Sequence, residues 1–155
     1  MTLTKEAAEA PPPLGPDPTP SGGAGRILQL LAVLALVTAL FVLLGWGYLL
    51  LFIVILVVIV MLHELGHFAT AKWAGMKVTE YFVGFGPRLW SVRRGETEYG
   101  VKAIPAGGYV RITGFTSTED VPAEDEPRAY RNQPFHQRII VASAGSVVHF
   151  LIAIV

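Results

Sequence analysis

A run of 36 residues without an aspartate, glutamate, lysine or arginine, from Ile27 to Leu62, limits the possible folds more than any other feature. As one helix it would extend about 54 Å, whereas the hydrocarbon core of a bilayer is about 30 Å thick. Residues 45–48, GWGY, lie near its middle and combine flexible glycines with aromatic residues that favour the membrane interface. We therefore expect two transmembrane helices, over residues 27–44 and 48–74.

Positive charges flank this pair of helices, and the turn between them carries no charge. Arg26 precedes the first helix, and Lys72, Lys77 and Arg88 lie at the end of the second helix or beyond it. The positive-inside rule then puts the N-terminus in the cytoplasm and the chain in the inner (cytoplasmic) membrane as a multi-pass protein. A cleaved signal peptide is the competing reading of the first helix, but the 25 residues before it, some acidic, favour a retained anchor.

The rest of the chain divides by composition. Residues 1–25 are rich in proline and glycine and predict a disordered cytoplasmic tail. Residues 76–114 hold short β-branched and aromatic runs split by glycine and proline, which predict a membrane-associated β-meander of three or four strands. We expect an acidic, mobile loop over 115–127, an amphipathic lead-in over 128–138, and the truncated start of a further transmembrane helix over 139–155.

The overall composition agrees with this division. Hydrophobic residues make up 52% of the chain and charged residues only 15%, which is typical of a membrane protein. We therefore predict a mainly α-helical polytopic membrane protein with a small β-meander between its second and third spans. No basic cluster suggests a nucleic-acid partner, and the expected surroundings are the lipid bilayer.

Ionisable residues at the end of the apolar run indicate a metal site. His63 and His67 are four residues apart on a predicted helix, so both imidazoles project from one face and can bind one ion. Glu64 follows within reach of a water on that ion. This H-E-x-x-H pattern is typical of zinc hydrolases, in which the glutamate acts as general base. Charged residues at bilayer depth cost about 2.5 to 3.5 kcal/mol each, which favours a functional role over a chance match.

The chain has no cysteine, so any metal is held by nitrogen and oxygen. A catalytic zinc normally takes three protein ligands, and the predicted helix supplies two. Further along the chain, His136 precedes the last apolar segment and His149 lies within it. His149 is either near the metal or a histidine hydrogen-bonded within the helix bundle, and the sequence leaves both readings open.

Four segments in the same order make the chain resemble the bacterial site-2 proteases, the intramembrane zinc metalloproteases of regulated proteolysis. The likeness runs from about Leu44 to the end of the chain. Its segments are HELGHFATAKWAGMKV, YFVGFGPRLWS, AIPAGGYVRITGF and RNQPFHQRIIVASAGS. The resemblance implies that His63 and His67 bind Zn²⁺ and that Glu64 is the catalytic base.

The resemblance also assigns a role to the β-region. It implies that Gly107, Gly108 and Tyr109 help to present an unwound substrate strand, and a peptide bond outside a helix is indeed open to attack by water. A purely structural hairpin at the membrane surface is the alternative. Where the family often has Ala-Gly-Pro-x-x-Asn, this chain places His149 at the asparagine position, and His149 can donate a hydrogen bond to substrate in its stead.

The family's third zinc ligand is an aspartate in a later helix, which would lie beyond Val155, as would a PDZ domain. We therefore expect an N-terminal fragment of a zinc endopeptidase that cleaves transmembrane segments of membrane-anchored regulators such as anti-sigma factors. One alternative is a truncated or inactive relative that binds metal or client helices without cleaving them. Another, a membrane-anchored protease with a cytoplasmic catalytic domain, is disfavoured because a β-rich stretch and an apolar segment follow the motif.

Overall fold

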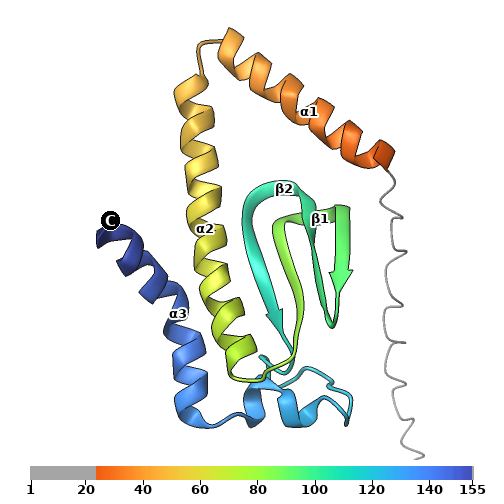
Figure 1. Ribbon diagram of the computed structural model, residues 1–155, viewed down its shortest axis with the longest axis vertical. Helices are drawn as coiled ribbons and strands as arrows, with labels where there is room; N and C mark the ends of the chain where they lie inside the picture. Colours follow the sequence, from red (N-terminus) through yellow and green to blue (C-terminus); the bar gives the residue numbers. More distant parts are fainter. Residues whose placement is uncertain (1–23, 155) are drawn as a thin grey trace, which may run out of the picture.

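The structure is a computed structural model that describes residues 24–154. Except for its last two residues, the tail expected over residues 1–25 lies outside this range. A central helix, α2, has a sheet on one side and helix α3 on the other (Figure 1). The elements in chain order are α1 (Ala24–Leu43), α2 (Gly47–Trp73), β1 (Val78–Arg94), β2 (Thr97–Ile112), the 3-10 helices η1 (Glu126–Arg128) and η2 (Tyr130–Asn132), and α3 (Phe135–Ile154).

Three of the described helices, α1, α2 and α3, are long and apolar enough to cross a membrane. Most of their large apolar side chains are exposed, as expected of helices that lie in lipid. The predicted fold class, mainly helical with a small sheet between the second and third spans, is confirmed.

Glycines with positive φ end both of the first two helices. Gly45, at φ 73°, lies in the tight turn from α1 to α2, where the Trp46 amide donates to the Phe41 carbonyl at 2.8 Å. Gly75, at φ 76°, follows α2, and the Met76 amide donates to the Ala71 carbonyl at 3.0 Å. Such glycine caps satisfy the last helix carbonyls and turn the chain sharply. The second cap directs the chain from α2 straight back into β1.

The sheet has two long strands in the described chain where the sequence predicted three or four short ones. Each strand bends and continues instead of ending. Gly84, at φ 83°, allows the bend in β1, and a β-carbon on it would lie only 2.6 Å from the Ile104 carbonyl oxygen of β2. The glycines and prolines that marked strand ends in the sequence therefore mark bends within strands.

Because of these bends, the first half of β1 pairs on both of its sides. Residues 78–83 are opposite 108–112 along one side, and 80–83 are opposite 98–101 along the other, while 88–94 pair with 97–102. The pairings of 78–83 with 108–112 and of 88–94 with 97–102 are antiparallel, whereas 80–83 and 98–101 run in the same direction. Residues 108–112 therefore form an edge: within the described chain they pair only with 78–83, and their other side has no strand partner.

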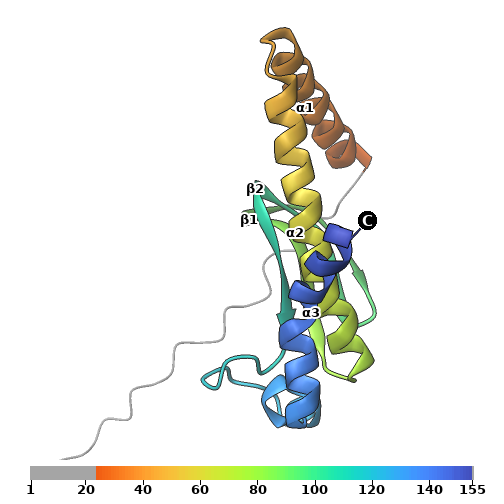
Figure 2. The same cartoon turned by 90° about the vertical axis from the view of Figure 1, so that its left-hand side faces the viewer.

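The sheet packs against α2 at the level of the H-E-x-x-H motif (Figures 1 and 2). The Tyr81 hydroxyl donates to the Met61 carbonyl at 2.9 Å, and Phe68 contacts the Tyr81 and Tyr99 rings at centroid distances of 5.3 and 5.8 Å. Gly108 lies so close to Met61 that a β-carbon would overlap the Met61 sulfur. These contacts place the β2 edge beside the predicted catalytic residues.

A buried core joins the lower ends of the elements. Its members come from the end of α2, the turn that follows it, both strands and α3, and are Ala71, Met76, Val78, Ile112 and Val141. The expected mobile loop is tied to this core, since the Tyr130 amide donates to the Thr113 carbonyl at 2.9 Å and Lys77 is ion-paired with Asp125 at 2.5 Å. The loop therefore has a defined position under the sheet and α2.

Candidate metal and catalytic site

His63 and His67 face each other one turn apart on α2. Their Nε2 atoms are 3.2 Å apart and their ring centroids 4.9 Å apart. Two nitrogens bound at about 2.0 to 2.1 Å to a tetrahedral zinc ion lie about 3.3 to 3.4 Å from each other. The two imidazoles are thus already separated as two ligands of one zinc ion would be.

A backbone carbonyl from α3 orients His67. The His67 Nδ1 atom lies 2.7 Å from the Val141 carbonyl oxygen, which can only accept a hydrogen bond. The proton therefore sits on Nδ1, and the lone pair of Nε2 points toward His63. Metal-binding histidines in proteins are typically held in this way by a second hydrogen bond, which sets the tautomer and the ring orientation.

His63 has different surroundings. Its Nδ1 atom is buried and has no hydrogen-bond partner among the described residues. The ring of His149 lies beside it, with centroids 4.7 Å apart and planes tilted by 47°. In the described chain no group of three histidines, aspartates or glutamates is placed to hold one metal ion together. The described residues thus supply two suitable ligands for one zinc ion, His63 and His67. His149 lies beside this pair.

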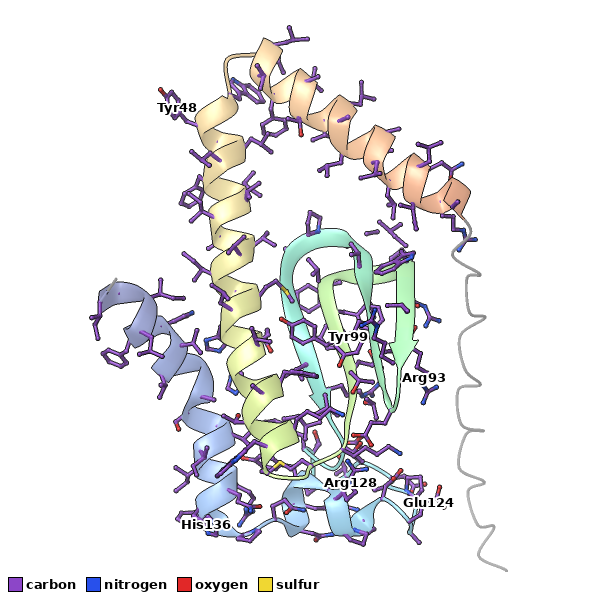
Figure 3. The ribbon with its side chains drawn as sticks, in the orientation of Figure 1. Tyr48, Arg93, Tyr99, Glu124, Arg128 and His136 are labelled. Carbon is purple, nitrogen blue, oxygen red and sulfur yellow. The ribbon has the colours of Figure 1, made fainter. Side chains whose placement is uncertain are left out.

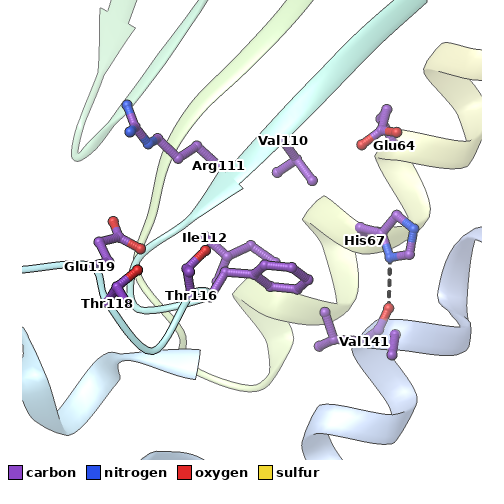
Figure 4. A pocket seen from close by; sticks show the side chains of 11 residues that line it. Glu64, His67, Val110, Arg111, Ile112, Thr116, Thr118, Glu119 and Val141 are labelled. Carbon is purple, nitrogen blue, oxygen red and sulfur yellow. Dashed lines mark hydrogen bonds between the residues drawn. The ribbon is translucent and has the colours of Figure 1, made fainter. Parts of the chain in front are cut away.

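Glu64 lines a cavity of about 590 Å³ together with His67. The cavity lies between α2, the end of β2, the following loop and the start of α3, and Glu64 points toward the β2 side (Figure 4). Val110, Arg111 and Ile112 line its β2 wall. The wall is the unpaired edge described above, so an extended peptide added to this edge would lie in the same cavity as Glu64 and His67.

The structure thus places His63, Glu64 and His67 together on α2, with Glu64 and His67 lining the cavity. Gly107 and Gly108 lie further along β2, where Gly108 abuts Met61 and Gly107 lies near Phe85. Tyr109 stacks on Phe82 at 5.8 Å and hydrogen-bonds to Glu80, away from the cavity lining. A substrate role for residues 107–109 and for His149 stays a prediction.

Several residues of the site were not found from the sequence. The Val141 carbonyl, Arg111 and Glu119 all belong to it, the last two as lining of the cavity. No local pattern marks them, because a backbone carbonyl has no residue signature and Glu119 lies in an acidic stretch that is ordinary for a loop. Gly145, whose α-carbon abuts the His63 ring, was recognised only as part of a family motif.

Comparison with known proteins agrees with this geometry. The model of Peptidase family M50 matches residues 51–155. Zinc metalloprotease Rip1 of Mycolicibacterium smegmatis is 49% identical over 109 residues, which cover 68% of this chain and 27% of that protein. Rip1 of Mycobacterium tuberculosis is 48% identical over 105 residues, covering 68% and 26%, and a putative zinc metalloprotease of Synechocystis is 42% identical over 99 residues, covering 64% and 27%.

The chain spans about a quarter of the length of these curated relatives. The family match covers both the H-E-x-x-H helix and the sheet that packs on it, and it extends through α3. It therefore includes every element that lines the cavity. This chain belongs to peptidase family M50, the site-2 protease family of zinc metalloproteases.

Proposed function

We propose that this chain carries the zinc-binding and general-base elements of an intramembrane endopeptidase. The observation that supports the proposal best is the His63–His67 pair, with Nε2 atoms 3.2 Å apart and the His67 tautomer set by the Val141 carbonyl. This pair lies within a helix long and apolar enough to cross a membrane. A bound metal satisfies polar groups that would otherwise be costly at that depth.

Each residue of the site has a separate role. His63 and His67 hold the zinc ion, which when bound lowers the pKa of a coordinated water to about 7. Glu64 lies on the cavity side of α2, where its carboxylate takes the proton of the attacking water and later returns it to the leaving amine. A third ligand completes the site from outside the described residues. The family resemblance suggests an aspartate for it.

The unpaired edge of β2 orients the substrate. A transmembrane helix shields its peptide bonds by internal hydrogen bonding, so it must unwind before water can attack it. The backbone groups of residues 110–112 that face away from β1 replace those bonds when the unwound segment pairs with them. We propose membrane-anchored regulatory proteins, such as anti-sigma factors, as the substrates, on the strength of the family resemblance.

We also propose an orientation of the chain in the inner membrane. Arg26 near the start of α1, and Lys72 and Lys77 at the far end of α2, put the charged ends of both helices on one side of the bilayer. By the positive-inside rule, this side is cytoplasmic, with the turn at Gly45 on the opposite side. The cavity then opens toward the cytoplasmic leaflet.

The complete gene product, in lipid vesicles with a transmembrane reporter, tests the proposal. We expect cleavage that a chelator stops and added Zn²⁺ restores, and that Glu64→Gln abolishes while the protein still binds zinc. Cleavage that persists in Glu64→Gln would remove Glu64 from its assigned role. Zinc binding without cleavage in the unmodified protein would favour the alternative of an inactive relative that holds metal or client helices.

A further inference from the structure

The cavity beside Glu64 has two chemically different ends (Figure 4). At one end are the catalytic residues Glu64 and His67, with apolar Val110 and Val141 nearby. The opposite end lies under the sheet, near the charged end of α2, and is polar. Its polar lining residues are Arg111, Thr116, Thr118 and Glu119, and Phe115 also lines the cavity.

The net charge of the polar end is negative. The Arg111 guanidinium is neutralised by Glu80 at 3.0 Å, and Glu80 also accepts a hydrogen bond from the Tyr109 hydroxyl. Glu119 has no cationic side chain within ion-pair distance among the described residues, since Arg131 pairs with Glu126 and Arg111 pairs with Glu80. Arg111 interacts with Glu119 only at longer range. At the polar end, the carboxylate of Glu119 is therefore the charged group that no described side chain pairs with directly.

The backbone holds Glu119 in place. Its Oε2 atom accepts the Gly114 amide at 2.9 Å, and its own backbone carbonyl accepts a hydrogen bond from Arg131 at 2.9 Å. Gly114, at φ 69°, lies two residues beyond the end of β2. These hydrogen bonds hold the Glu119 carboxylate at a defined position relative to the β2 edge.

When a substrate pairs with the β2 edge, the strand spacing determines which of its residues lies beside Glu119. Residues 110–112 of the edge span about 10 Å in a strand, so a segment paired with them reaches the polar end about three residues from the bond near Glu64. That end lies on the side of the membrane marked by Lys72 and Lys77. Transmembrane helices carry an excess of lysine and arginine at this same side.

We infer that Glu119 is a specificity residue that binds a lysine or arginine on the cytoplasmic side of the cleaved bond, about three residues from it. The inference rests on the proposed function, because it names a substrate feature for the same cavity. Thr116 and Thr118 add hydroxyl acceptors at the same end. An acidic or uncharged residue at that substrate position binds less well, because it leaves the Glu119 carboxylate without a cation.

A purely structural role for Glu119 is the competing explanation, since its carboxylate accepts the Gly114 amide. Glu119→Gln separates the two roles, because a glutamine oxygen still accepts that hydrogen bond but carries no charge. Glu119→Lys reverses the charge. Glu124→Gln is the matched control, because Glu124 lies in the same loop but outside the cavity lining and points away from the protein (Figure 3).

Binding measures the preference without relying on cleavage. Fluorescent transmembrane peptides that differ only by Lys, Gln or Glu, placed two to four residues on the cytoplasmic side of the expected site, are titrated against the complete gene product in micelles. Every protein carries Glu64→Gln to prevent turnover. We expect the best Lys peptide to bind about three- to fivefold more tightly than its Gln counterpart, as for a half-exposed ion pair, and the Glu peptide to bind more weakly.

The ratio of the affinities for the Lys and Gln peptides is determined for each variant separately. A partly unfolded variant therefore cannot be mistaken for one that has lost the preference. Glu119→Gln is expected to bring the Lys-to-Gln ratio to about one, Glu119→Lys to favour the Glu peptide, and Glu124→Gln to keep the ratio. Equal binding of all three peptides, or a preference that survives Glu119→Gln, overturns the inference. Failure of the proposed function shows separately, as absence of chelator-sensitive cleavage by the protein with Glu64 intact.

Discussion

Gly145 of α3 lies directly against the imidazole of His63, so close that a β-carbon would overlap the ring atoms Cε1, Nε2 and Nδ1. The same helix pair makes a second close contact, where a β-carbon on Gly66 would come within 2.9 Å of the Ala144 carbonyl oxygen. Small residues let membrane helices approach each other closely. Here the approach of α3 to α2 also positions both histidines, since α3 contributes the Val141 carbonyl to His67.

The first prediction concerns this contact. In Gly145→Ala the new methyl group displaces the His63 ring or separates α3 from α2, and either shift disturbs the pair of Nε2 atoms. We expect zinc affinity to fall by about 10- to 100-fold, comparable with loss of an orienting partner, and stability to fall by about 1 to 3 kcal/mol. Titration of the purified protein with zinc and thermal unfolding in detergent measure both effects.

Gly47→Ala is the control for that substitution. Gly47 begins α2, and a β-carbon there meets no atom within 4 Å. Zinc affinity is expected to stay as it is, and the helix to be slightly more stable, since alanine is a better helix former than glycine. Equal zinc binding by the Gly145→Ala and Gly47→Ala proteins would show that α3 does not position His63.

A second prediction addresses the metal ligands. His63→Ala and His67→Ala each remove one of two ligands from the same helix, so we expect bound zinc to fall by about 100-fold or more. Elemental analysis of the dialysed proteins measures it. His136→Ala, at the exposed start of α3 (Figure 3), serves as the control and should retain metal. A double variant that holds as much zinc as the unmodified protein would place the metal elsewhere.

A third prediction concerns acid stability. Hydrogen bonding from Arg128, supported by Lys72, lowers the pKa of Glu96 to about 2. Because this folded value lies below the ordinary one of 4.5, the ionised carboxylate stabilises the fold above pH 4.5, and the contribution is lost as pH falls from about 4.5 to 2. These side chains are partly exposed and screened by solvent, so we expect about 1 kcal/mol or less.

Melting temperatures of the unmodified protein and of Glu96→Gln, measured between pH 2 and 6, isolate this contribution. The difference between the two should be largest near pH 6 and vanish near pH 2, and 1 M salt should reduce it. Glu124→Gln controls for the loss of any surface carboxylate. A constant difference at all pH values would mean that the ion pairs of Glu96 do not contribute.

A fourth prediction tests the sheet as a packed unit. Phe82 is 1% exposed and stacks on Tyr109, whereas Phe85, three residues along the same strand, is 45% exposed. Phe82→Ala leaves a cavity between the sheet and its neighbours and should cost about 3 to 5 kcal/mol. Phe85→Ala should cost much less. Thermal unfolding compares them, and equal losses would mean that the burial of Phe82 does not hold the sheet.

Local sequence patterns were sufficient to predict the helices and the placement of His63, Glu64 and His67 on one of them. The uncharged run from Ile27 to Leu62 and the glycines within it predict two apolar helices, because length and hydropathy act within one segment. The i, i+4 spacing of His63 and His67 places both rings on one face of any helix, and Glu64 beside them. The β-region was predicted as a sheet, but its bent strands were not, since a glycine in a strand pattern marks a bend as readily as an end.

Only the tertiary structure showed which residues from other elements contact the two histidines and line the cavity. The Val141 carbonyl that orients His67 is 74 residues away in the chain, and the contact between Gly145 and His63 exists only because α3 packs against α2. The position of Glu119 at the polar end of the cavity depends on how β2 ends and how its loop is tied back to the core. The sequence by itself determined the helices and the pairing of His63 with His67 on one helix face, since side-chain spacing within a helix is a local property. The cavity and its charge came from packing between distant segments, which no local pattern encodes.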